Sequence, residues 1–185
     1  MAEKDIEQFL LQKLAKSELE GLDITSAHDS LVRNLGDLVA NNKFQVFHDD
    51  NRWNPNPEVG RDVIGGMVPD IVLRSLKSGE NRIYIEVKET DHLRYNKEDS
   101  QIIRYFLHLL FTTKKEPNED IQRAILLAAP SAWFTDVTNA EKWQHFLDNY
   151  GGLASRFDVT LGEIHLCNSC KKAVLDRNRV CPTCR

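Results

Sequence analysis

Two carboxylates and a lysine are the residues of this chain whose types and spacing most directly suggest chemistry. Asp70 ends the segment Met67-Val-Pro-Asp70, and Glu86 and Lys88 lie in Ile83-Tyr-Ile-Glu-Val-Lys88. Carboxylate oxygens suit Mg²⁺ or Mn²⁺, and such a metal polarises a phosphoryl group and helps to generate hydroxide. The lysine would orient the nucleophile or offset the charge that grows on the phosphoryl group. The pattern predicts phosphodiester hydrolysis, although it is also typical of solvated strand residues with a glutamate–lysine pair on one face.

Two neighbouring strands are expected to position these three side chains. Residues 67–75 and 82–88 form the strands, and residues 77–81 have the glycine and asparagine chemistry of a hairpin loop. In the second strand Glu86 and Lys88 alternate with three apolar residues, so both point to the same face. The hairpin would bring the aspartate of the first strand across from the end of the second strand.

An amphipathic helix is expected at residues 98–113, followed by a buried strand at residues 121–129. Its polar side carries Gln101, Tyr105 and His108. Its apolar arc consists of Ile102, Ile103, Phe106, Leu107, Leu109 and Leu110. The helix therefore lies, in chain order, between the hairpin and a further strand of the same sheet.

With this order of strand, strand, helix and strand, the chain resembles the PD-(D/E)xK nuclease superfamily, which has the restriction-endonuclease-like fold. Residues 101–105 (Gln-Ile-Ile-Arg-Tyr) are similar to the Q-x-x-x-Y helix motif of its RecB-like and Cas4-like branch. The resemblance covers roughly residues 25–130. It implies an α/β fold with an αβββαβ core, in which helices flank a mixed sheet.

The resemblance also implies a role for each matched residue. Asp70 and Glu86 would bind the catalytic Mg²⁺ or Mn²⁺, and Lys88 would act in catalysis. Gln101 and Tyr105 would line the site and contact the nucleic acid. For the last two, the alternative is an ordinary polar helix face.

Members of the superfamily supply one more site residue from the helix before the first strand, a glutamate or, in the RecB-like branch, a histidine. That helix is expected here at residues 26–41, and His28 shares its apolar face. We therefore expect His28 to be an accessory metal-binding or catalytic residue. Asp29, three residues after Ser26, is explained more simply by helix capping. The absence of a glutamate departs from the family pattern and leaves the number of catalytic metals open.

All four cysteines of the chain lie near its C-terminus, as Cys167-Asn-Ser-Cys170 and Cys181-Pro-Thr-Cys184. Two C-x-x-C pairs ten residues apart predict a tetrahedral, structural Zn²⁺ site, and the segment resembles a zinc ribbon. Disulfides would need an oxidising compartment, and the chain opens with a charged helix rather than a signal peptide. An Fe–S cluster occurs in some Cas4-like nucleases, but there one cysteine precedes the nuclease core.

The cysteine-rich segment is basic, whereas the rest of the chain is acidic. Residues 167–185 contain five basic residues and one acid, in a chain whose net charge is −4. The loop at residues 49–66, which is rich in Asn, Pro and Gly, could also grip a strand of nucleic acid. The candidate nucleic-acid-binding residues are Arg52, Arg61, Lys171, Lys172, Arg177 and Arg179. The alternatives are a solvated zinc ribbon and an ordered surface loop.

The predicted organisation is an N-terminal helix (residues 1–24), a nuclease-like domain (residues 25–160) and a zinc ribbon (residues 161–185). Within the nuclease-like domain a further helix is expected at residues 139–150, opened by Thr138 and ended by Gly151 and Gly152. No apolar run reaches the ~20 residues that span a bilayer, and we expect a cytoplasmic protein that does not enter membranes. The predicted function is a metal-dependent deoxyribonuclease with DNA as its partner, acting as a monomer, as a homodimer or within a larger assembly. Two alternatives are an inactive nuclease-fold protein that binds nucleic acid or protein, and a nuclease that acts on RNA.

Overall fold

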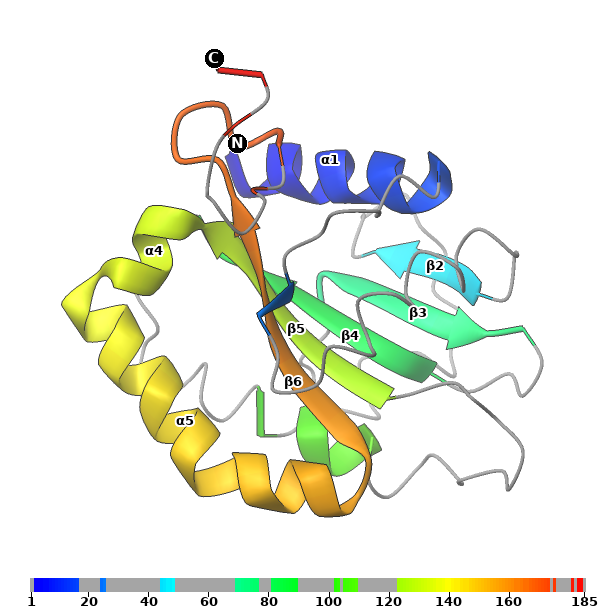
Figure 1. The fold of residues 1–185 in the computed structure, drawn as a ribbon. Coiled ribbons are helices and arrows are strands. Elements are labelled where there is room, and N and C mark those ends of the chain that lie inside the picture. The colour runs from blue at the N-terminus through cyan, green and yellow to red at the C-terminus, as the bar shows by residue number, and fades with distance from the viewer. Residues whose placement is uncertain are drawn as a thin grey trace.

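The structure of the chain is a computed structural model, which describes residues 2–16, 24–25, 44–48, 69–76, 81–89, 102–103, 105–109, 123–173, 175, 181 and 183–184. These residues form an α/β fold around a six-stranded mixed sheet (Figure 1). The strand order across the sheet is β1-β6-β5-β4-β3-β2. The predicted class, a mixed sheet with flanking helices, is confirmed to this extent.

Most of the predicted elements are present. The ends of the strands are shifted by one or two residues, except that the strand expected at residues 67–75 begins at residue 71. The strands are β1 (Ile24–Thr25), β2 (Phe44–His48), β3 (Ile71–Ser75), β4 (Asn81–Val87), β5 (Arg123–Pro130) and β6 (Val159–Leu166). The helices are α1 (Ala2–Lys16), α4 (Ser131–Thr135) and α5 (Val137–Arg156). Residues 102–103 and 105–109 are also helical.

The strand directions decide which residues meet at the edge of the sheet. Strands β4, β5 and β6 run parallel, whereas β3 is antiparallel to both β2 and β4. The carboxyl ends of β4, β5 and β6 therefore lie at one edge. Ile71 of β3 pairs with Ile85 of β4, so the residue before β3 lies at the level of Glu86. This register supports the predicted hairpin arrangement of the two strands.

The sheet is buried on both faces, and alternate residues of each central strand enter different clusters. Ile83, Ile85 and Val87 of β4 pack on one face with Ile6 and Leu10 of α1. Tyr84 lies on the opposite face, in a cluster that includes residues of the helical segment 102–109, α4 and α5. Because side chains alternate across a strand, Glu86 shares the face of Tyr84 and points toward the helical segment.

Two expectations near the site need correction. Asp70 lies in a bend before β3, so it is not within the strand as expected. The buried face of the helical segment is the predicted one in part: Ile102, Phe106 and Leu109 are buried as expected. Tyr105, which was assigned to the polar side, is also fully buried, whereas Leu107 is 40% exposed. Tyr105 carries a large apolar ring, and its hydroxyl finds a buried partner, so it belongs to the packed face of the helix.

Helix α5 is longer at both ends than the predicted helix at residues 139–150. It begins after Asp136, whose side chain accepts a hydrogen bond from the Asn139 N–H; Thr138 was the expected cap. It also continues through Gly151 and Gly152, which were expected to end it. The helix ends at Arg156, with Phe157 as its C-cap. The next residue, Asp158, takes the left-handed backbone conformation that ends many helices.

The main sheet extends to the edge of the cysteine-rich segment. Strand β6 pairs with β5 along its whole length, up to Leu166 opposite Pro130. Residues 161–166 are therefore part of the central sheet, and the cysteine-rich segment begins at Cys167. Among the described helices, none has the length and apolar character needed to cross a membrane.

Candidate active site and cysteine cluster

Glu86 is the most enclosed charged group of the predicted site. It lies near the carboxyl end of the central strand β4 and is 4% exposed. Its Oε1 lies 2.9 Å from Lys88 Nζ, and its Oε2 accepts a hydrogen bond of 3.2 Å from the Tyr105 hydroxyl. The ammonium group and the phenol thus contact the two oxygens of one buried carboxylate. Three of the residues singled out from the sequence meet at this point.

Asp70 reaches the same strand from β3. Its side chain is half-buried, and Oδ2 accepts a hydrogen bond of 2.6 Å from the Val87 N–H. This N–H precedes Lys88, whose own N–H bonds Ala128 O of β5 at 2.9 Å. Asp70 is therefore anchored to the β4 backbone one residue beyond Glu86. Glu86 thus comes from β4, and Asp70 comes from the bend that precedes the neighbouring strand β3.

A polar and aromatic layer supports Glu86 from the helical segment. The Tyr84 ring packs edge-to-face on Tyr105 with ring centres 5.6 Å apart, and its hydroxyl lies 2.6 Å from His108 Nδ1. Burial lowers the pKa of His108 below its ordinary value of 6.5. Depending on its tautomer, the neutral imidazole either accepts a hydrogen bond from the Tyr84 hydroxyl at Nδ1 or donates one from Nδ1 to the phenol oxygen.

Arg123 fixes this helical segment to the end of α5. The guanidinium is 7% exposed and donates to Leu109 O at 3.1 Å and also to Phe157 O. Phe157 caps the C-terminus of α5, where carbonyl groups have no partner within the helix, so a buried guanidinium satisfies its carbonyl well. The contact holds the segment that carries Tyr105 at a defined height above the sheet.

Asp70 and Glu86 have the chemistry that a hard divalent cation requires. Both offer carboxylate oxygens at the same edge of β3 and β4, and Mg²⁺ is commonly held by one or two carboxylates with water and phosphate oxygens as the other ligands. Lys88 supplies a positive charge beside them.

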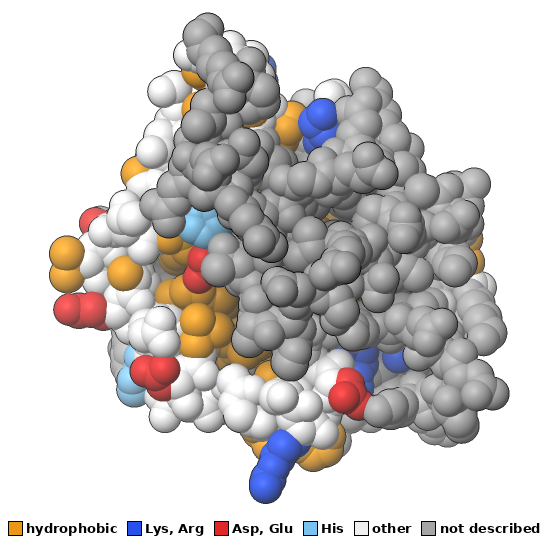
Figure 2. Space-filling model, viewed as in Figure 1, with side chains coloured by type: hydrophobic (Ala, Val, Ile, Leu, Met, Phe, Trp, Pro, Cys, Tyr) orange, Lys and Arg blue, Asp and Glu red, His pale blue; other side chains and the backbone are white. Residues whose placement is uncertain are grey.

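Several predicted site residues lie outside the described residues. These are His28, Arg52, Arg61, Gln101, Arg177 and Arg179. Lys171 and Lys172 are described and lie in the turn after Cys170. On the face shown in Figure 2, the described Lys and Arg side chains are scattered and do not form a patch.

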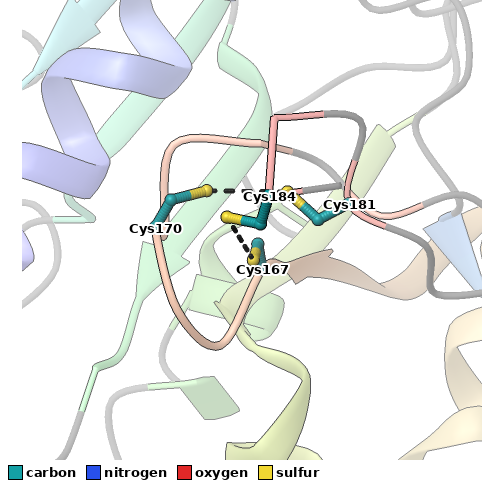
Figure 3. A group of neighbouring side chains, drawn as sticks. All are labelled: Cys167, Cys170, Cys181 and Cys184. Carbon is teal, nitrogen blue, oxygen red and sulfur yellow. Dashed lines mark hydrogen bonds between the residues drawn. The ribbon is translucent and has the colours of Figure 1, made fainter.

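The four cysteines come together at one point, as the paired motifs predicted (Figure 3). Their sulfur atoms all lie within 4.8 Å of one another. Cys167 Sγ is 3.9 Å from Cys184 Sγ, and Cys170 Sγ is 3.7 Å from Cys181 Sγ. Four sulfurs bound tetrahedrally to zinc at about 2.3 Å would be about 3.8 Å apart. Cys167, Cys170, Cys181 and Cys184 therefore form a possible zinc site.

The charge state of the thiols is consistent with a metal-binding role. Burial raises the pKa of Cys167, but backbone hydrogen bonds from Cys170 and Ser169 outweigh it and bring the pKa to about 6. Hydrogen bonds from Cys181 and Cys170 raise the pKa of Cys184 to about 12. Neighbouring sulfurs thus disfavour a second thiolate, and a divalent cation would replace the shared protons.

A polar network beside the first cysteine was not found from the sequence. His165 Nε2 lies 2.7 Å from Glu163 Oε2, and His165 Nδ1 lies 3.3 Å from Ser131 Oγ. Trp143 Nε1 donates to Glu163 Oε1 at 2.7 Å, and the Phe134 ring stacks on His165 with centres 4.3 Å apart. The network joins β6 to α4 and α5. In the sequence, the only indication of this network was that Glu163 and His165 are two residues apart on a strand, which places both side chains on one face.

This network also supports the cysteine cluster. Leu175 N–H bonds His165 O at 3.0 Å, and Cys167 N–H bonds Ala173 O at 2.9 Å. The segment after β6 thus folds back alongside the strand end. Cys167 is 5% exposed, so the first cysteine is built into the end of the sheet and not into a separate module.

Comparisons of this chain with protein-family models, with curated proteins and with solved structures found no match.

Proposed function

We propose that this protein is a metal-dependent nuclease of the restriction-endonuclease-like class, which hydrolyses phosphodiester bonds in DNA. One observation carries the proposal: the buried Glu86 carboxylate is contacted by both Lys88 and Tyr105 at the carboxyl end of β4. Glu86 and Lys88 belong to the segment that resembles the PD-(D/E)xK pattern, and Tyr105 belongs to the segment that resembles the Q-x-x-x-Y motif. The order of β3, β4, helical segment and β5 is consistent with the same class.

The cost of burying charge supports a functional reason for the pair. Glu86 and Lys88 have side chains that are only 5% and 13% exposed. A buried ion pair is often no more stabilising than apolar residues of similar size, because both charges lose their hydration. Two ionisable groups that are held together and buried at a strand end are therefore candidates for a functional site.

Each residue has a distinct part in the proposed reaction. Asp70 and Glu86 would hold Mg²⁺ or Mn²⁺, which polarises the phosphoryl group and lowers the pKa of a bound water. Lys88 would place its ammonium group beside the attacked phosphate and offset the charge that develops there. Tyr105 would fix the orientation of the Glu86 carboxylate, and Asp70 is itself oriented by the Val87 N–H.

The test is cleavage of labelled single-stranded DNA, duplex DNA and RNA side by side, with and without Mg²⁺ or Mn²⁺. We expect metal-dependent loss of DNA with the wild-type protein and none with Glu86→Gln. Glu141→Gln, which removes the same charge from an exposed position on α5, should cleave like the wild type. Circular dichroism of all three proteins checks that each is folded.

The remaining outcomes separate the alternatives. Cleavage of RNA but not of DNA would show that the protein is a nuclease that acts on RNA. Binding of nucleic acid without cleavage under any metal condition would indicate an inactive protein that has kept the fold. Full activity in Glu86→Gln would sink the assignment of the site.

A further inference from the structure

We propose that the cysteine cluster controls the position of the candidate active site, through the ion pair between Lys171 and Glu89. In this view Lys171 is a positioning residue, and metal binding by the cysteines is transmitted through it to the end of β4. The inference rests on the proposed function only for its effect on cleavage; the structural coupling stands on geometry alone.

The geometry begins with the shared edge of the sheet. Lys88 and Glu89 directly follow β4, and Cys167 directly follows β6, with β5 between the two strands. Because these three strands are parallel and neighbouring strands lie about 4.8 Å apart, the two chain segments leave the sheet roughly 10 Å from each other. The turn that carries Cys170 spans this gap.

Lys171 makes the contact across the gap. Its Nζ forms an ion pair with Glu89 Oε1, and the Glu89 side chain is 12% exposed. Its own N–H bonds Cys167 O at 2.9 Å. Lys171 is thus held at two points: its backbone N–H bonds a cysteine carbonyl, and its side chain pairs with a carboxylate at the end of β4.

The backbone of Lys171 has an unusual conformation that the contacts around the turn must hold in place. Its φ is 55°, in the left-handed region that L side chains rarely adopt. Such a conformation persists where the surroundings determine it. The adjacent Cys170 is one of the four metal ligands, so metal binding would hold this conformation and aim the Lys171 side chain toward Glu89.

The other end of the ion pair is close to the proposed chemistry. Glu89 follows Lys88, whose ammonium lies 2.9 Å from Glu86 Oε1. The amides of Val87 and Lys88 bond Asp70 Oδ2 and Ala128 O. A shift of Glu89 would therefore disturb the short segment that positions both Lys88 and the Asp70 carboxylate.

The first test uses Lys171→Met in the zinc-loaded protein, with zinc content measured. Amide hydrogen exchange at residues 87–89 is the readout. We expect the variant to keep its zinc and to exchange about tenfold faster in this segment, a typical size for coupling between sites. Arg156→Met, which removes a positive charge from an exposed position at the end of α5, should leave exchange unchanged.

Two further variants keep the test decisive. Glu89→Gln breaks the same ion pair from the β4 side. It serves as the test variant if Lys171→Met loses its zinc. The charge-exchanged double variant Lys171→Glu with Glu89→Lys should restore slow exchange. Removal of zinc from the wild type should speed exchange, and the effect should be smaller in Lys171→Met because the two changes act on one pathway. Unchanged exchange at residues 87–89 in both single variants would overturn the inference.

Cleavage kinetics distinguish positioning from direct contact with nucleic acid. A positioning role predicts that Lys171→Met lowers kcat about tenfold with KM unchanged, because misplaced reacting groups slow the chemical step. A higher KM with unchanged kcat and unchanged exchange would instead make Lys171 a nucleic-acid contact. Should the wild type cleave nothing, the proposed function fails, and hydrogen exchange still decides on the coupling.

Discussion

The hydroxyl of Tyr105 donates a hydrogen bond of 3.2 Å to Glu86 Oε2 inside the fold, where Tyr105 is 0% and Glu86 4% exposed. The bond joins the helical segment to the central strand at a charged group. A hydrogen bond to a charged group contributes about 1.5–3 kcal/mol, and loss of one partner leaves the other unsatisfied. The contact therefore serves both the fold and the orientation of the carboxylate.

Tyr105→Phe should lower the free energy of unfolding by about 1.5–3 kcal/mol. The ring and its packing against Tyr84 remain, so the loss is that of the hydroxyl alone. The proposed nuclease activity should fall as well, because Glu86 loses one of the contacts that orient its carboxylate. Urea denaturation and cleavage rates measure the two effects.

Tyr150→Phe is the matched control for this change. Tyr150 lies on α5, and its ring packs on Phe146 and Phe106. Loss of its hydroxyl should leave cleavage unchanged. Equal cleavage rates in Tyr105→Phe and the wild type would remove Tyr105 from the site.

The stability of the fold should depend on pH through His108. Burial lowers the pKa of His108 in the folded protein below 6.5, so as the pH falls the unfolded chain binds this proton first. The free energy of unfolding therefore decreases as the pH falls through 6.5 toward the folded-state pKa. The stability difference between the wild type and His108→Gln should shrink from about pH 7.5 to about pH 5.5, in urea titrations.

Thr138→Ala provides the comparison, since Thr138 is exposed on α5 and carries no titratable group. Its stability should stay parallel to that of the wild type over the same range. A pH-independent difference between the wild type and His108→Gln would contradict the role of burial.

The carboxylates, the lysine and the cysteines could be predicted because their spacing is local. Glu86 and Lys88 are two residues apart on a strand, so alternation alone places them on one face, and their 2.9 Å contact follows. Two C-x-x-C pairs likewise define a compact cluster before any fold is known. The strand at residues 82–88 was also predictable from its alternation of polar and apolar residues, and the strand at residues 121–129 from its apolar character.

The face of the helical segment could not be read from polarity. Tyr105 and His108 count as polar, yet their hydrogen-bonding atoms meet Glu86 and Tyr84 beneath the helix. Which polar atoms find a partner depends on the sheet below. The two partners are 19 and 24 residues away in sequence, so tertiary packing decides these contacts. The same holds for the Ser131–His165–Glu163 network, whose members come from α4 and β6.

In helix α5, tertiary packing overrides the tendency of glycine to end a helix. Gly151 and Gly152 were expected to end the helix, but the helix continues because Ala154 packs in the core beyond them. A Cβ added at either glycine meets nothing within 4 Å. Gly152→Ala should therefore raise the free energy of unfolding by about 0.5–1 kcal/mol, since glycine loses more backbone freedom in a helix than alanine.

The reverse substitution tests the same reasoning. Ser155→Gly, at an exposed position near the end of α5, should lower the stability by a comparable amount. Thermal or urea unfolding of both variants is the measurement. A destabilised Gly152→Ala would show that the helix does not run through residues 151 and 152 in solution.

The cysteine cluster should bind one divalent metal per chain in a tetrahedral thiolate site. Addition of Co²⁺ to metal-free protein should produce the visible absorption of tetrahedral thiolate coordination and saturate at one equivalent, since four sulfurs leave no further ligand position. Cys181→Ser should weaken zinc binding by more than the roughly 10–100-fold seen when only a supporting residue is lost. Ser169→Ala, in the same turn but contributing only its backbone N–H, should bind zinc like the wild type. Because Cys167 is buried at the end of β6, zinc removal should also lower the stability of the main domain, and a melting temperature unaffected by chelation would contradict that connection.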